Sequence, residues 1–140
     1  MRKIVFRIKD IDIWYYGFPL REVRPEDLYI PFQGEDENGN SFYSISVDVK
    51  TLGQFTGLCD KNGKKIFEGD IVKGTIVSSW AKQKIKCKVI YEKDRFVCID
   101  IDGGVHKVMF GKDIAVIGNI YDNPELLKGE WYGRKIDWKR

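Results

Sequence analysis

Short stretches in which apolar and polar residues alternate recur along the chain, and turn-forming residues separate them. Ile4, Phe6 and Ile8 begin one such stretch, and residues 42–47 form another. Alternation with a period of two residues places the apolar side chains on one face of a β-strand. The breaks between stretches, such as Asp60-Lys61-Asn62-Gly63, have the residues that tight hairpin turns require. The sequence therefore predicts a mainly β protein built from short strands and hairpins.

Further strands are predicted over residues 84–91, 96–101, 105–110 and 115–121. The strand over residues 115–121 is expected to be the last in the chain. Residues 17–40 contain Pro19, Pro25 and Pro31, and predict loops with short strands. One helix is expected, because Asn123 suits an N-cap, Pro124 the first helical position and Gly129 the end.

Composition and cysteine usage favour a cytoplasmic protein. The chain has 43% hydrophobic and 32% charged residues, a globular profile. Its three cysteines are an odd number without a CxxC pair, unlike a secreted disulfide scaffold. No signal peptide is visible, and no apolar run approaches the ~20 residues of a membrane helix. We therefore expect the cytoplasm of a bacterial host and no membrane contact.

The sequence predicts no catalytic, cofactor or metal site. The possible zinc ligands Cys59, Cys87, Cys98 and His106 lack the closely spaced pair that structural zinc sites use. His106 is the only histidine, and no nucleophile accompanies it in a known pattern. We therefore expect a protein that is not an enzyme and that binds no cofactor.

Lysine occupies every second position of one predicted strand, at Lys82, Lys84, Lys86 and Lys88. On a strand this spacing gives one face of lysines and one mostly apolar face. The lysines either form a solvated face that protects an edge strand from aggregation, or follow the phosphates of a nucleic acid. Like charges ~7 Å apart repel one another, so an acidic partner would relieve them.

The C-terminal residues combine aromatic and basic side chains. Residues 128–140 contain five basic and two acidic groups and so account for the whole net charge of +3. The side chains that could contact a nucleic acid or another protein are Trp131, Tyr132, Arg134, Lys135, Trp138, Lys139 and Arg140. They could equally pack on the body of the protein or on a neighbouring subunit, because Trp, Tyr and Arg favour interfaces.

Two longer segments resemble the signatures of a known family. They are Thr51-Leu52-Gly53-Gln54-Phe55-Thr56-Gly57-Leu58-Cys59-Asp60-Lys61-Asn62-Gly63-Lys64-Lys65-Ile66-Phe67-Glu68-Gly69-Asp70-Ile71-Val72 and Ile117-Gly118-Asn119-Ile120-Tyr121-Asp122-Asn123-Pro124-Glu125-Leu126-Leu127. Their order and spacing, with the opening strand Ile4 to Asp10, resemble the YopX family of phage and prophage proteins. The resemblance implies a mainly β fold and no known catalytic activity.

The resemblance also implies a small SH3-like barrel in the C-terminal two-thirds, with an N-terminal β-rich extension and a short C-terminal helix. We expect one domain over residues 1–140, which divides, if at all, into a region of strands and loops (1–50), the barrel (51–130) and the basic aromatic tail (131–140). The signature glycines and Asp70 are interpreted as turn chemistry rather than as a binding site.

Two functions remain open. The first is a non-enzymatic phage or prophage accessory protein that contacts a host or phage protein and forms a homo-oligomer. The alternative is a small β-barrel that binds nucleic acid through the lysine-bearing strand and the tail.

Overall fold

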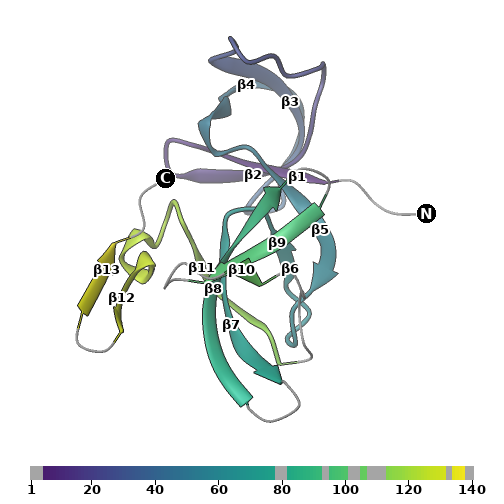
Figure 1. Ribbon diagram of the computed structural model, residues 1–140. Helices are drawn as coiled ribbons and strands as arrows, with labels where there is room; N and C mark the ends of the chain where they lie inside the picture. Colours follow the sequence, from purple (N-terminus) through teal and green to yellow (C-terminus); the bar gives the residue numbers. More distant parts are fainter. Residues whose placement is uncertain are drawn as a thin grey trace. The chain divides into compact units, whose positions relative to one another are not determined.

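The computed structural model describes residues 5–77, 82–92, 95–100, 105–106, 113–131 and 134–137, which form strands and two short 3-10 helices (Figure 1). The mainly β prediction is confirmed. The elements are β1 (Phe6–Asp10), β2 (Ile13–Pro19), β3 (Tyr29–Asp36), β4 (Ser41–Asp48), η1 (Val49–Thr51), β5 (Gly53–Cys59), β6 (Lys65–Phe67), β7 (Asp70–Val77), β8 (Lys82–Glu92), β9 (Arg95–Asp100), β10 (Val105–His106), β11 (Ala115–Asn119), η2 (Pro124–Leu127), β12 (Lys128–Trp131) and β13 (Arg134–Asp137). None of the described helices is long and apolar enough to cross a bilayer.

The chain divides into two compact units, Met1–Gly57 and Leu58–Arg140. The division lies inside β5, later than the position after residue 50 at which we expected a subdivision. Because β5 continues from the first unit into the second, the central signature segment contributes strands to both units.

The first unit is an antiparallel sheet with the strand order β4-β3-β2-β1-β5, and β6 follows β5 in the same sheet. Its core consists of Ile8, Ile30, Phe32 and Val47, which are fully buried. Ile8 lies on β1 as the alternating pattern predicted. β1 and β2 form a hairpin, in which Ile11 has a positive φ of 57°.

Residues 17–40 contain more strand than predicted, because β2 reaches Pro19 and β3 spans Tyr29–Asp36. Proline is disfavoured inside a sheet because it lacks an N–H donor. Pro31 is tolerated in β3 because its partner in the neighbouring strand is Leu20, just beyond the end of β2, whose N–H donates to the Pro31 carbonyl at 2.9 Å. Asn38 and Gly39 form the turn between β3 and β4, in which Gly39 has φ 83°.

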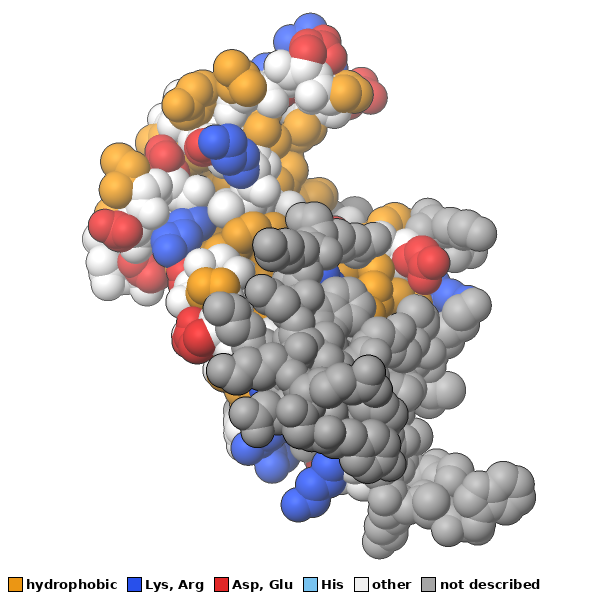
Figure 2. All heavy atoms as spheres, turned by 60° about the vertical axis from the view of Figure 1, so that its left-hand side comes forward, with side chains coloured by type: hydrophobic (Ala, Val, Ile, Leu, Met, Phe, Trp, Pro, Cys, Tyr) orange, Lys and Arg blue, Asp and Glu red, His pale blue; other side chains and the backbone are white. Residues whose placement is uncertain are grey.

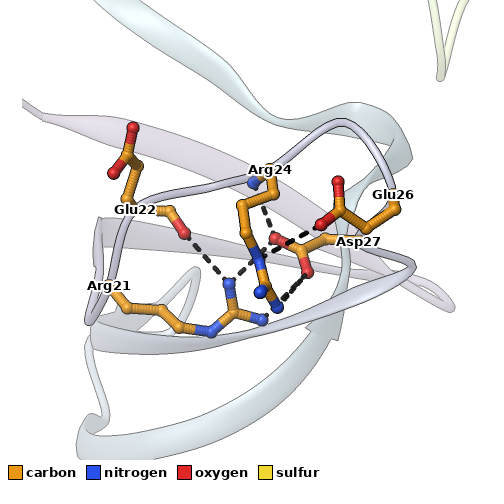
Figure 3. A network of polar contacts seen from close by, with 5 residues as sticks. All are labelled: Arg21, Glu22, Arg24, Glu26 and Asp27. Atoms are coloured by element: carbon orange, nitrogen blue, oxygen red, sulfur yellow. Dashed lines mark hydrogen bonds and ion pairs between the residues drawn. The ribbon is translucent and has the colours of Figure 1, made fainter.

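The loop between β2 and β3 is held together by the carboxylate of Asp27 (Figure 3). The Arg21 guanidinium donates to both Asp27 oxygens, at 2.8 and 3.1 Å. The backbone N–H of Arg24 donates to Asp27 Oδ2 at 2.7 Å, and the Arg24 guanidinium donates to Oδ1 at 3.3 Å. The hydrogen bonds from Arg21 and Arg24 keep the pKa of Asp27 well below its ordinary value. The charge of Asp27 is therefore neutralised within the loop itself.

The second unit contains an antiparallel sheet with the order β10-β9-β8-β7-β11. The core on one face includes Val72, Cys87, Val89 and Cys98, with Ile66 and Ile114 packed against them. The long β8–β9 hairpin was predicted correctly. The described strands run from β10 to β11 without closing, so the SH3-like barrel remains a prediction.

The C-terminal elements differ from the sequence-based expectation. The predicted helix is a single 3-10 turn, η2, and the described residues contain no α-helix. β11 is not the last strand, because β12 and β13 form a separate hairpin within residues expected to be a tail. A segment of four residues is too short for a stable α-helix without extensive packing, which explains the 3-10 form.

Candidate anion-binding face

The pairing of β7 with β8 brings three lysines together on one face of the second sheet. Lys84 and Lys86 are two residues apart on β8, and Lys73 of β7 lies directly opposite Lys86. Lys73 and Lys84 are exposed, and Lys86 is half-buried. Directly opposed residues in an antiparallel pair have Cβ atoms roughly 5 Å apart. We call Lys73, Lys84 and Lys86 the lysine cluster.

The lysine cluster is electrostatically unfavourable by itself. Like charges directly opposite each other in a sheet destabilise the pairing, and Lys73 and Lys86 are such a pair. Within the described part of the chain, no ion pair joins these lysines to an acidic side chain. A bound anion would therefore remove a repulsion that the described residues leave in place.

Sequence reasoning missed Lys73, because its place in the cluster depends on the register between two strands. The residue stands alone in the sequence between Val72 and Gly74. The only available signal was its alternation with Ile71 and Thr75 on one strand, and alternation does not reveal which residue of the next strand lies opposite.

The predicted lysine face is wrong at Lys88, which is buried with 5% of its surface exposed. Ile71 and Ile99 lie directly opposite Lys88 on the two neighbouring strands. Leu126 and Leu127 of η2 line the same shallow pocket as these residues and Lys86. The lysine side of the sheet therefore has an apolar half near η2 and a basic half formed by the lysine cluster. Lysine stems are long enough to be covered by apolar side chains in this way.

Lys82 is the first residue of β8 and pairs with Val77 of β7. The C-terminal candidates are divided between described and undescribed residues. In the β12–β13 hairpin, Trp131 pairs with Arg134, Glu130 with Lys135, and Lys128 with Asp137. Tyr132, Trp138, Lys139 and Arg140 lie outside the described residues.

The structure separates the cysteines that were weighed as zinc ligands. Cys59 is exposed, whereas Cys87 and Cys98 are buried in the core of the second unit. His106 pairs with Cys98 in the β9–β10 register. Among the residues that the structure describes, no group of three His, Cys, Asp or Glu side chains is placed to hold a metal ion.

Asp60 connects the central signature segment to β11. Its Oδ1 accepts hydrogen bonds from the backbone N–H groups of Asn62 at 2.8 Å and Lys64 at 2.9 Å. Its Oδ2 accepts from the N–H of Val116 on β11 at 2.9 Å. Burial alone would raise the pKa of Asp60, but these three donors outweigh it and lower the pKa.

Other signature residues also serve the backbone. Gly57, Gly63 and Gly69 have positive φ angles of 90°, 81° and 93°, which favour glycine. Asp70 is buried and accepts from the N–H of Phe67 at 2.8 Å. Gly63 and Gly69 therefore lie at turns, whereas Gly57 lies within β5, and the candidate site lies on the neighbouring strands.

We expect Gly118→Ala to displace η2 from the sheet. A methyl group at this position would lie 2.5 Å from Asn123 Oδ1 and 2.9 Å from Leu126 Cδ1. Such overpacking costs about 1–3 kcal/mol of folding free energy. Urea denaturation measures that loss, and acetylation with mass spectrometry should show faster modification of Lys88. Unchanged stability with Lys88 still protected would contradict the role of η2 as its cover.

Comparison with known proteins agrees with this fold and adds no ligand. The crystal structure of protein EF1440 from Enterococcus faecalis superimposes with a TM-score of 0.56 at 24% sequence identity. The alignment covers 91% of this chain and 99% of that chain, and it shows a shared fold. No curated protein matches the chain. The family model described as YopX protein matches residues 21–128, which include both signature segments in full, and the chain therefore belongs to the YopX family.

Proposed function

We propose that this protein is a non-enzymatic binding protein whose lysine cluster contacts the phosphate backbone of a nucleic acid. The observation that carries the proposal is the cross-strand pair Lys73–Lys86, extended along β8 by Lys84. Three cations without an ion pair among the described residues favour a partner that supplies several negative charges.

The chemistry of the cluster favours a backbone contact over the reading of bases. Lysine binds phosphate as a point charge and lacks the bidentate geometry of arginine. Bases are typically recognised by Arg, Asn or Gln, and the cluster contains only lysines. We therefore expect binding that depends little on nucleotide sequence and strongly on salt concentration.

Titration with labelled DNA tests this function. The protein should bind a duplex of about 20 base pairs at about 50 mM salt, with equal affinity for unrelated sequences. Poly-glutamate of matched charge serves as the competitor. Absence of DNA binding at low salt would refute the proposal. If poly-glutamate displaces the DNA at an equal concentration of negative charges, an acidic protein is the better partner.

A protein-interaction module is the second candidate, and the surface of the first unit favours it. Hydrophobic side chains lie among charged ones over this unit, in the upper part of Figure 2. Exposed apolar side chains there include Phe18, Leu28, Tyr29 and Tyr43, the last with 77% of its surface exposed. Large apolar side chains exposed on one unit are candidates for contact with another protein.

The wider biological role rests on the sequence. An accessory role in a phage or prophage follows from the family resemblance. The absence of catalysis is proposed because the sequence contains no recognisable nucleophile–base, metal or cofactor motif. Both candidate functions are compatible with such a role, and the DNA titration separates them.

A further inference from the structure

β4 is an edge strand of the six-stranded sheet and pairs only with β3. It spans eight residues, Ser41–Asp48, and carries no charged side chain before Asp48. Proteins commonly block exposed edges with lysine or proline, or distort them with a bulge. β4 has no lysine or proline, and its one register irregularity lies toward its beginning, opposite β3 between Phe32 and Gly34. The second half of the strand is therefore a regular, uncharged edge.

The hydrogen bonds around β3 identify which groups of β4 face outward. In an antiparallel ladder, the N–H and C=O of one residue point to the same side. The Pro31 carbonyl accepts from Leu20, so the backbone of Pro31 faces β2. Ser46 lies opposite Pro31 in a pair without hydrogen bonds, and its N–H and C=O therefore point away from β3. The backbone of Asp48, two residues later, points the same way.

We propose that the β4 edge pairs antiparallel with β4 of a second copy of this chain, about a two-fold axis at Ser46. In this register the outward N–H and C=O of Ser46 bond to the same groups of Ser46 in the second copy. Ile45 lies opposite Val47, so the core-facing side of both strands stays on one face of the joined sheet. The uncharged edge lets two identical strands meet without opposing charges. Exposed Tyr43 on β4 and Tyr29 on β3 border the edge.

Substitution at the symmetry centre tests this dimer. The wild-type chain should show a monomer–dimer equilibrium in sedimentation velocity at concentrations up to about 1 mM, the Kd of a marginal complex. Ser46→Pro removes only an outward N–H, one from each copy, and should weaken the dimer by about thirtyfold. Ser46→Thr keeps that N–H and suits a strand, so it should dimerise like the wild type.

A charge pair makes the test specific for this register. Ser46→Lys and Ser46→Glu should each weaken self-association about fivefold, because each places like charges opposite each other. Mixing the two variants should restore the dimer, because the opposed charges then attract. A wild-type chain that stays monomeric, or charge variants that remain separate when mixed, would overturn the proposal. Retained strand content in circular dichroism confirms that each variant is folded.

Discussion

Replacing Lys73, Lys84 and Lys86 with glutamine should abolish measurable binding to duplex DNA at low salt. Each phosphate contact contributes about 0.9 to the slope of log affinity against log salt concentration. At about 50 mM salt, one contact therefore raises the affinity about tenfold over its value at about 1 M salt. Three lost contacts therefore lower the affinity by roughly a thousandfold under these conditions. Fluorescence anisotropy with a labelled duplex measures the change.

The matched control removes the same charge elsewhere. Lys50, Lys64 and Arg95 are exposed and lie outside the lysine cluster. Their triple replacement with glutamine changes the net charge equally and should leave most of the affinity intact. If this control loses as much affinity as the cluster variant, net charge rather than the cluster determines binding. We expect the cluster variant to keep its stability or gain some, because the opposed pair Lys73–Lys86 is removed.

Asp60→Ala should destabilise the second unit by about 3 kcal/mol or more, because three backbone donors lose their charged acceptor. Asp60 has only 8% of its surface exposed, so water cannot readily replace the carboxylate. Asp60→Asn should have an intermediate effect. Its one oxygen can still accept from Asn62 and Lys64, whereas its amide group would face the Val116 N–H. Urea denaturation measures both losses.

Asp36 provides a matched control from the same chain. Its Oδ1 accepts from the N–H groups of Asn38 and Asn40, the same local turn that Asp60 makes with Asn62 and Lys64. Among the described residues, the Asp36 carboxylate bonds only to Asn38 and Asn40, whereas that of Asp60 also reaches Val116 on a distant strand. Asp36→Ala should therefore cost clearly less than Asp60→Ala. Equal losses would show that the turn alone, and not the link to β11, makes Asp60 important.

The lowered pKa of Asp60 also predicts a dependence of stability on pH. A carboxyl group whose pKa is lower in the folded state stabilises the protein above its unfolded pKa of about 3.9. That contribution is lost as the pH falls below about 4 and through the folded pKa. Asp60→Asn should therefore lose less stability than the wild type between neutral and acidic pH. Parallel stability curves for the two proteins would contradict this assignment.

Features set by local chemistry could be predicted from the sequence. The turn at Asn62-Gly63 was found because glycine adopts a positive φ angle at low cost, as Gly63 does here. The β8–β9 hairpin followed from the alternating pattern on both sides of a short turn. The role of Asp70 in a turn was also correct, since its carboxylate bonds to the backbone three residues earlier.

Features set by distant segments could not be predicted. The burial of Lys88 depends on η2, which returns to the sheet from almost forty residues further along the chain. The place of Lys73 opposite Lys86 depends on the register between β7 and β8. The strand around Pro31 was missed because the cost of placing a proline without an N–H in a sheet depends on where the neighbouring strand β2 ends. Each error arises from a tertiary contact that overrides a correct local preference.

The most direct test of whether the lysine cluster contacts phosphates is the salt dependence of DNA affinity. It is measured in parallel for the wild type and for the variant in which glutamine replaces Lys73, Lys84 and Lys86. The slope of log affinity against log salt concentration should be shallower for the variant by about 2.7, or 0.9 for each contact. Because the variant binds weakly, its line is measured at the lowest salt concentrations. Parallel lines for the two proteins would contradict the proposed function, because the cluster would then make no phosphate contact.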